Sequence, residues 1–556
     1  MPVTYVNPSY FTYLLLLASV PGLRAQDTHT QQPPQAELLQ EFRPIGGTGN
    51  NLNHPALDVV PGTPEIAIAP LNFAPGTSDG LISAPNPRTI SNVIAGGTGA
   101  NGQNGETNDP TASAWLYVFG QFVDHDLDLE ETPLTSTPIN IVVPPGDPVF
   151  AAGTSIAMTR DTRSPVTNTI INTTAGYLDL SQLYGSTPAI AASLANADGT
   201  LMSSDNGKAL PVVNGSFVSG DPRVMENPEL TALTILFMRE HNFWVATLKA
   251  QNPSWTGSQL YNMAKAITTA EYQNIVYQEY LPLLVGQAVP PYKGYDPSVN
   301  AQVTQEFSTA AFRMGHSEVS DTQEGLDNNG NVVFTESLAQ AFFNTPAIDE
   351  SNGIDPLIRS VGADFSQATD VYTVGALRNL LFADLVGGGI DEMDLIAIDI
   401  RRESDVGLGS LNQTRRALGL RPFSSFAELT SDPVLQKGFQ TVYGDIANVD
   451  LFMGGLAEAH ASGAEVGPTF QKIIANQFGA LRSGDRFFWL NQGFDQQLAS
   501  AIESTTLGEI IKRNTDTTVT LQPNVFLEQT IGGHVERPAV QPNQIETHGR
   551  KPAFQY

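Results

Sequence analysis

The chain has 556 residues, with 28 Lys or Arg against 57 Asp or Glu, so its formal net charge is −29. This balance argues against nucleic acid and anionic membranes as partners, since both need a positive surface. Solubility in a salty or acidic medium explains the charge, and selection for cationic substrates is the alternative. The sequence has no cysteine, which excludes disulfides, zinc–thiolate sites, iron–sulfur clusters and thiolate-bound haem.

The N-terminal segment differs in composition from the rest of the chain. Residues 10–20 form an apolar run that is too short to span a membrane but suits the core of a secretory signal. No Lys or Arg precedes this run, so an ordinary N-terminal extension is the alternative. We predict a signal peptide over residues 1–25 and a secreted protein. No later apolar segment reaches the length of about 18 residues that a spanning helix needs.

Residues 26–110 are rich in Pro, Gly, Asn and Thr, which is typical of turns and loops. We expect this segment to form a loop-rich arm over the body of the protein. A glycine-rich phosphate cradle is the competing interpretation, but no GK[ST] or strand–GxGxxG–helix pattern supports it. The body is then predicted over residues 111–530, followed by a C-terminal tail over 531–556.

Helical spacing begins near residue 113, where Trp115, Val118, Phe119 and Phe122 share one face. A short strand is expected at 517–521, and the Asn-Asn-Gly-Asn stretch at 328–331 is typical of a hairpin turn. The prediction is a mainly α fold, a single large helical domain with long loops and little β. Further helices are expected over residues 228–249, 257–279, 307–316, 370–382, 467–478 and 498–511.

Two of the eight histidines stand out by their neighbours. Gln121, Asp124 and His125 fall at i, i+3 and i+4 of the first helix, so one face presents an amide, a carboxylate and an imidazole. A helix end with solvated acids is the alternative. The second is His316, which follows an apolar stretch; taken alone, it is better explained as a structural histidine.

These segments resemble the animal-type haem peroxidases of the peroxidase–cyclooxygenase superfamily, the family of myeloperoxidase, lactoperoxidase and their bacterial relatives. The resemblance runs in collinear order from about residue 40 to about residue 530. The motifs that carry it are Gly-Gln-Phe-Val-Asp-His-Asp (120–126), Asp-Pro-Arg-Val-Met-Glu-Asn-Pro (221–228), Phe-Arg-Met-Gly-His (312–316), Asn-Val-Asp-Leu-Phe-Met-Gly-Gly (448–455) and Arg-Ser-Gly-Asp-Arg-Phe-Phe-Trp (482–489).

The resemblance implies a role for each matched residue. His316 would be the axial ligand of the haem iron, and Asn448 would accept its other N–H. His125 would move a proton between the two oxygens of hydrogen peroxide, leaving an oxyferryl haem, and Arg223 would stabilise the charge on the departing oxygen. Gln121 belongs to the same catalytic group. Arg313 is placed among the haem contacts.

The resemblance also implies how the haem b is held and what it oxidises. Asp124 and Glu226 match the carboxylates that form ester bonds to haem methyl groups, although Glu226 alone is also explained as a helix N-terminal acid. Asn227 stands where myeloperoxidase has a haem-bonded methionine. We therefore expect no sulfonium link, and bromide, iodide, thiocyanate or phenols as donors in preference to chloride.

A calcium site is the next implication. Asp126 and the segment at 175–181 match the family's calcium site. They offer the mixture of carboxylate, hydroxyl and carbonyl oxygens that calcium prefers. The sequence departs from the pattern at one position, where Ala175 replaces a threonine and Thr174 precedes it. A polar turn before a helix is the alternative. The expected ligands are Asp126, Ala175, Tyr177, Asp179 and Ser181.

Two other functions compete with a peroxidase. A fatty-acid oxygenase of the same superfamily places a radical-forming tyrosine three residues before the proximal histidine, where this chain has Arg313. A haem-free structural or adhesive protein on a degenerate peroxidase fold is the second alternative. Joint retention of His125, Arg223 and His316 argues against it. The sequence leaves the oligomeric state open.

Overall fold

The computed structural model describes residues 37–73, 85–96, 108–133, 136–204, 207–342, 348, 353–383, 390–518 and 521–527. The predicted signal peptide at 1–25 and tail at 531–556 lie outside these residues, as do 74–84 and 97–107 of the predicted arm.

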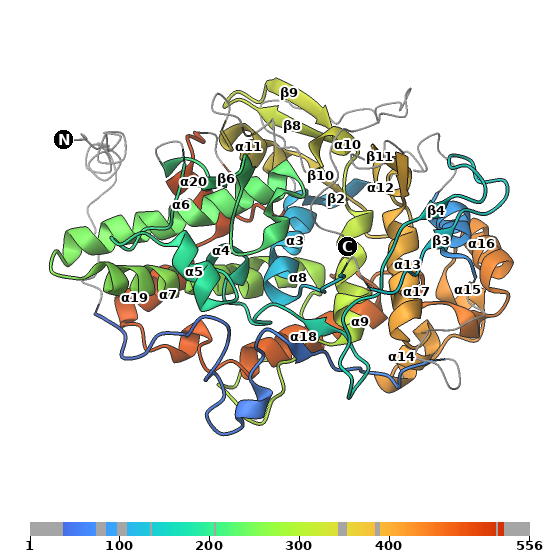
Figure 1. Ribbon diagram of the computed structural model, residues 1–556, viewed down its shortest axis with the longest axis horizontal. Helices are drawn as coiled ribbons and strands as arrows, with labels where there is room; N and C mark the ends of the chain where they lie inside the picture. The colour runs from blue at the N-terminus through green and yellow to red at the C-terminus, as the bar shows by residue number, and fades with distance from the viewer. Residues whose placement is uncertain are drawn as a thin grey trace, which may run out of the picture.

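The architecture is built from helices. The two longest, α6 (Pro228–Gln251) and α7 (Gly257–Ile275), lie side by side, and α3 (Trp115–Leu127) packs against α6 (Figure 1). The mainly α prediction is confirmed. The other helices are α2 (Pro87–Ile90), α4 (Ser181–Tyr184), α5 (Pro188–Leu194), α8 (Leu281–Leu284), α9 (Gln305–Ser308), α10 (Leu338–Ala341), α11 (Asp355–Ala363), α12 (Gly375–Arg378), α13 (Leu395–Val406), α14 (Leu411–Ala417), α15 (Phe426–Leu429), α16 (Pro433–Tyr443), α17 (Leu451–Leu456), α18 (Pro468–Ser483), α19 (Gln496–Ser504) and α20 (Leu507–Asn514).

In the described part of the chain, strands form only two-stranded antiparallel ladders. The longest joins β8 (Thr322–Leu326) to β9 (Val332–Ser337), and the turn between them contains the predicted hairpin residues 328–331. The other pairs are β1 (Thr63–Pro64) with β5 (Ile171–Asn172), β2 (Asn108–Ser113) with β10 (Phe365–Gln367), β3 (Ile141–Val142) with β4 (Ser155–Ile156), β6 (Val212–Val213) with β7 (Ser216–Phe217), and β11 (Leu380–Ala383) with β12 (Ile390–Met393).

Helix α3 runs through the centre of the core. Every residue of α3 is buried except Gln121 and Asp124, which are half-buried. Its Phe122 stacks on Phe237 of α6 at 5.1 Å between ring centroids, and Phe119 meets Phe526 edge-on at 5.2 Å. Each such side chain contributes about 1.5–3 kcal/mol on full burial. Of its polar side chains, Gln121, Asp124 and His125 face an internal cavity, and Asp126 faces the loop at 179–181.

The start of α3 is fixed by the far end of the chain. Ser113 donates from its backbone N–H to the carbonyl of Phe526 at 2.9 Å and from Oγ to the carbonyl of Val525 at 2.6 Å. Ser113 is fully buried. The 521–527 segment therefore sets where the helix begins.

The described part of the predicted arm lies against another late segment. Arg43 forms a buried ion pair with Asp485, and Arg486 pairs with Glu41 at 2.6 Å. Asn50 donates from Nδ2 to the carbonyl of Gly484 at 2.9 Å. Residues 41–50 are thus held by the loop that follows α18.

Several predicted elements differ from those observed. Residues 307–316 are not one helix, because Ala310 has non-helical dihedral angles and separates α9 from a 3₁₀ helix at Ala311–Ser317. Residues 498–511 split into α19 and α20, because Thr505 is extended and Thr506 caps the second helix. Of 370–382, only α12 is helical, and β11 begins at Leu380.

The predicted strand at 517–521 is also wrong where it is described, since residues 517 and 518 have no regular structure; residues 519 and 520 lie outside the described part. Among the described residues, the search for a helix long and apolar enough to cross a membrane finds none.

Candidate active site

One cavity of about 640 Å³ lies between two histidines. Helix α3 contributes Gln121, Asp124 and His125 to its wall, and the 3₁₀ helix Ala311–Ser317 contributes Arg313 and His316. Its volume falls within the range of about 300–1,000 Å³ that is usual for cofactor sites. The structure thus gathers into one site the distal and proximal residues that the sequence places almost two hundred positions apart.

His125 is buried and electrically neutral at ordinary pH. Burial, and then the nearby charge of Arg223, lowers the pKa of the imidazole to about 3. Its Nε2 lies 3.5 Å from Oε2 of Glu226. A neutral imidazole has one nitrogen free to accept a proton, which general-base chemistry requires.

Gln121 links the distal helix to the segment before α6. It donates from Nε2 to Oε2 of Glu226 at 2.8 Å, and its Oε1 accepts from Nδ2 of Asn227 at 2.8 Å. Asn227 also caps α6 by accepting from the backbone N–H of Leu230. Glu226 is thereby held beside His125 and inside the cavity wall.

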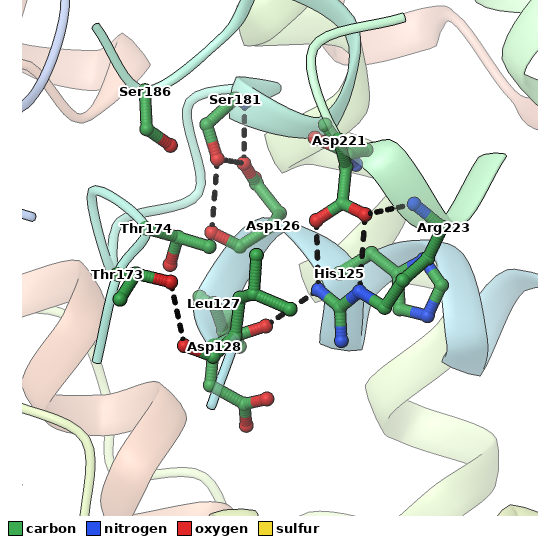
Figure 2. Close-up of polar contacts among 12 residues, drawn as sticks. His125, Asp126, Leu127, Asp128, Thr173, Thr174, Ser181, Ser186, Asp221 and Arg223 are labelled. Carbon is green, nitrogen blue, oxygen red and sulfur yellow. Dashed lines mark hydrogen bonds and ion pairs between the residues drawn. The ribbon is translucent and has the colours of Figure 1, made fainter. Parts of the chain in front are cut away.

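Arg223 is fixed by an acid that the sequence analysis did not single out. Asp221 accepts from Nε of Arg223 at 3.0 Å and from Nη2 at 2.8 Å, and Nη2 also reaches the carbonyl of Asp128 at 2.7 Å (Figure 2). Burial alone would lower the pKa of Arg223, but Asp221 raises it above its ordinary value. The arginine is therefore a permanent cation at the cavity wall. Asp221 also caps the 3₁₀ helix Pro222–Met225, a signal visible as Asp before Pro.

Asp124 lies on the cavity side of α3. Burial raises its pKa to about 6, against the opposing charges of Arg223, Arg313 and His316. Nearby Asp128 is buried, and its Oδ2 has no hydrogen-bond partner among the described residues. Both carboxyl groups line the cavity and are available to a bound group.

On the opposite wall, His316 is held by Asp399 of α13. The Nδ1 of His316 lies 2.7 Å from Oδ2 of Asp399, whose side chain is fully buried. A carboxylate only accepts, so Nδ1 carries a proton, and Nε2 is the nitrogen left for another partner. The imidazole is 31 % exposed, and it lines the cavity. This is the arrangement of a histidine poised to ligate a metal.

The predicted partner of His316 was wrong. Asn448 is exposed at the end of a short 3₁₀ helix (Ile446–Asn448), donates from Nδ2 to the carbonyl of Tyr443 at 3.2 Å and lines a different cavity. Helix α13 instead brings Asp399 to the imidazole. The only sequence signal for α13 was its helical pattern with Asp399 and Arg402 one turn apart, and Arg402 also lines the cavity.

Arg313 lies between the two walls. It donates from Nη1 to Oδ1 of Asp399 at 2.9 Å, from Nη2 to Oε1 of Glu130 at 3.0 Å and from Nε to the carbonyl of Ser308 at 2.8 Å. Burial opposes its charge, but Glu130 and Asp399 raise the pKa of Arg313 well above its ordinary value.

The predicted calcium loop lies directly behind the distal helix. Asp126 accepts from the backbone N–H groups of Asp179 and Leu180. It also accepts from the backbone N–H of Ser181 at 2.6 Å and from the Ser181 hydroxyl at 2.8 Å (Figure 2). The hydroxyl also lies 3.1 Å from the backbone carbonyl of Asp126. Burial, and then the charge of Asp179, raises the pKa of Asp126 to about 8.

The remaining residues of the predicted calcium site differ in whether they offer an oxygen to a cation. Ala175 and Tyr177 are buried in the same loop. The hydroxyl of Thr174 donates to Oδ1 of Asn172 at 3.0 Å, so it does not replace the missing threonine. Oδ1 of Asp179 is buried without a described partner. Within the described ranges, no three His, Asp or Glu side chains converge as a metal site, so a cation here would depend on two carboxylates and neutral oxygens.

Comparison with known proteins gives the class of enzyme to which this fold and site belong. Residues 42–526 match the family model described as animal haem peroxidase. The chain is 32 % identical to Peroxinectin A of Dictyostelium discoideum, over 88 % of this chain and 96 % of that protein. It is 31 % identical to mouse (Mus musculus) myeloperoxidase, over 93 % and 80 % of the two chains. The chain belongs to the animal haem peroxidase family and is an enzyme of the peroxidase type, and the family implies haem as its cofactor.

Solved structures agree. Peroxidase A from Dictyostelium discoideum superposes with a TM-score of 0.77 at 31 % identity, over 88 % of this chain and 99 % of that one. A fatty acid alpha-dioxygenase from Arabidopsis thaliana superposes with a TM-score of 0.74 at 20 % identity, over 91 % and 86 % of the chains. The second likeness concerns the fold alone.

Proposed function

We propose that this enzyme splits hydrogen peroxide at a haem b held between His125 and His316, and oxidises bromide, iodide, thiocyanate or phenolic donors. The observation that supports this most directly is the pairing of the two histidines across one cavity. One is buried and neutral beside a fixed arginine, and the other keeps Nε2 free while Nδ1 is tied to a carboxylate.

The distal residues would handle the proton of the peroxide. Nε2 of His125 takes a proton from one peroxide oxygen and returns it to the other, which makes the departing oxygen a better leaving group. Arg223, held by Asp221 and by the Asp128 carbonyl through Nε and Nη2, stabilises negative charge on that oxygen. Gln121 keeps Glu226 in place next to the imidazole.

The proximal residues would hold the cofactor. Haem supplies the iron and the porphyrin at which peroxide is reduced and oxidising equivalents are kept for the donor. His316 would ligate the haem iron through Nε2. Half-buried Arg313 and buried Arg402 are cations of the cavity wall that suit the haem carboxylates.

Asp124 and Glu226 would anchor the haem by ester bonds. Both line the cavity, and the pKa of Asp124 near 6 keeps a share of it protonated in neutral solution. Mass spectrometry of haem-bearing peptides after peroxide treatment tests this. Replacing both residues, Asp124→Asn with Glu226→Gln, should leave haem that organic solvent extracts in full. Complete extraction from the wild-type protein would contradict the ester bonds.

Asp126, Asp179 and Ser181 would bind calcium, with backbone carbonyls of Ala175 and Tyr177. Three oxygens from Asp126 and Ser181 already converge there, and Asp179 has an unpartnered oxygen. A divalent cation would relieve the burial of two neighbouring carboxylates. Its place behind α3 would stabilise the helix that carries His125.

The donor proposal rests on Asn227, which occupies the position of a sulfur-bonded methionine in the resemblance and here donates to Gln121. Its amide cannot form the sulfonium link that favours chloride. We also propose that the protein is secreted and that residues 111–530 form the enzymatic body, with 26–110 as an arm.

The decisive experiment is an absorption spectrum of the purified protein followed by peroxide-driven oxidation of iodide and guaiacol. A Soret band with activity is expected, together with loss of both in His316→Ala. A protein that binds no haem when haem is supplied would support a structural protein. Oxygen uptake with palmitate, without peroxidase turnover, would support the fatty-acid oxygenase.

A further inference from the structure

Asp399 is a fully buried acid of α13 that contacts the cavity residue His316. Its side chain has no solvent exposure, and its two oxygens serve two different partners. Oδ2 accepts from His316 at 2.7 Å, and Oδ1 accepts from Arg313 at 2.9 Å. The sequence analysis predicted a neutral amide at this place, whereas the structure has an anion.

An anion at Nδ1 changes what Nε2 offers to a metal. A hydrogen bond from an imidazole N–H to a carboxylate is charge-assisted and shorter than one to an amide, and it moves negative charge toward the ring. A more electron-rich imidazole stabilises the higher oxidation state of the iron that it ligates. A neutral amide would hold the ring in the same orientation without this effect.

Arg313 partly neutralises the negative charge of the Asp399 carboxylate. It takes the second oxygen of Asp399 and also pairs with Glu130, which lies two residues after Asp128 on the distal side. The result is a row of alternating charges, Glu130, Arg313, Asp399 and His316, which joins the distal chain segment to the proximal ligand. Removal of the cation leaves more of the charge of Asp399 to His316, and removal of the carboxylate leaves none.

We propose that Asp399 is a positioning residue that gives His316 anionic character and holds the haem iron in its ferric state, and that Arg313 limits this effect. The proposal rests on His316 being the axial ligand. It assigns to two paired side chains opposite influences on one measurable property, the ferric–ferrous midpoint potential.

The test compares variants of the haem-loaded enzyme by spectroelectrochemistry and by resonance Raman spectroscopy of the ferrous form. Asp399→Asn keeps a hydrogen-bond acceptor and removes the charge. We expect it to shift the ferric-to-ferrous ratio at fixed potential at least tenfold toward ferrous, which is ~59 mV for one electron. The iron–histidine stretching frequency should fall. Asp399→Glu should restore both values toward those of the wild type.

Arg313→Gln should move the potential in the opposite direction, toward a more stable ferric form. Asn448→Ala is the matched control, because Asn448 is exposed and lines the other cavity, and it should change neither reading. An unchanged potential and stretching frequency in Asp399→Asn would overturn the proposal. If Asp399→Asn fails to bind haem, a wild-type-like Asp399→Glu together with the Arg313→Gln shift supports it, and no shift in Arg313→Gln overturns it.

A wild-type protein that binds no haem overturns the proposed function, and the proposal about Asp399 with it. A haem-binding enzyme whose Asp399→Asn variant has an unchanged potential overturns the second alone. The haem content of the wild-type protein, measured as the pyridine complex, separates these two outcomes before any variant is made.

Discussion

Asp221 accepts hydrogen bonds from Arg223 with both carboxylate oxygens, from Nε to Oδ1 at 3.0 Å and from Nη2 to Oδ2 at 2.8 Å. The pKa of Asp221 lies below its ordinary value because Arg223 outweighs the effect of burial. Two parallel bonds fix the plane of the guanidinium as well as its position. The direction of the distal cation is therefore set by a neighbour only two residues away.

Weakening of these bonds should slow the peroxide step. In Asp221→Asn the arginine keeps its charge, loses one of its two side-chain bonds to residue 221 and keeps the other only to a neutral oxygen. We expect a fall of about tenfold in the rate of reaction with peroxide, less than the ~10²–10³-fold typical of deleting such a donor. Stopped-flow absorption measures the rate. Arg223→Lys is the comparison and should lose more. Equal rates for wild type and Asp221→Asn would show that the carboxylate does not position Arg223.

Replacement of His125 should be more severe. His125→Ala removes the proton carrier, and we expect a loss of ~10²–10⁴-fold in the rate with peroxide. The wild-type pH profile gives an independent check. Because the pKa of His125 is lowered to about 3, the neutral base persists as pH falls, and the rate should decline only as pH approaches that value. A decline centred near pH 6.5 would mean that the buried imidazole titrates like a free one.

Calcium removal should make stability depend on pH. The folded-state pKa of Asp126 is raised to about 8, above the unfolded value of 3.8, so without a cation the folded state is favoured below pH 3.8 and loses stability as pH rises toward 8. Chelator-treated enzyme should therefore show a falling Tm across this window, and calcium should restore it. Asp126→Asn should remove the response to calcium and reduce the pH dependence, part of which remains because burial also raises the pKa of Asp179. A Tm independent of chelator at pH 8 would contradict the calcium proposal.

The close approach of Gly120 to Tyr280, beside the site, can be tested with two single variants and their combination. A Cβ at Gly120 would lie 2.8 Å from the hydroxyl of Tyr280, so Gly120→Ala should destabilise the fold by about 1–3 kcal/mol. That hydroxyl is buried and has no hydrogen-bond partner among the described residues, so Tyr280→Phe alone should be neutral or stabilising. The double variant should recover most of the loss in denaturant unfolding. If the two substitutions change the free energy of unfolding additively, the Tyr280 hydroxyl is not what the new methyl group contacts.

The sequence predicted the long helices well and the interrupted ones poorly. Helices α3, α6, α7 and α18 carry long periodic patterns or strong starts such as Asn227 before Pro228. The helical pattern of the sequence runs through 307–316 and 498–511 because each break involves only one or two residues, here Ala310 and Thr505. A Thr-x-x-Glu capping pattern that starts at Thr506 marks the second break in the sequence, and the sequence analysis missed it. No such pattern marks Ala310.

The site shows the same division. His125, Arg223 and His316 lie in motifs and were predicted to converge, and the structure brings them to one cavity. Asp399 was missed because its role depends on α13 crossing beneath His316, a contact between positions 83 residues apart. Asn448 was chosen from its motif, but its amide is used locally by the carbonyl of Tyr443.

The bonds from Ser113 to the carbonyls of Val525 and Phe526 have a consequence for biosynthesis. The Ser113–Val525 bond spans 412 residues, so at ~5–20 residues per second a ribosome needs on the order of tens of seconds to supply the second partner. Until then the distal helix lacks its final anchor. A nascent chain can therefore contain both His125 and His316 while the start of α3 still lacks its partners at Val525 and Phe526.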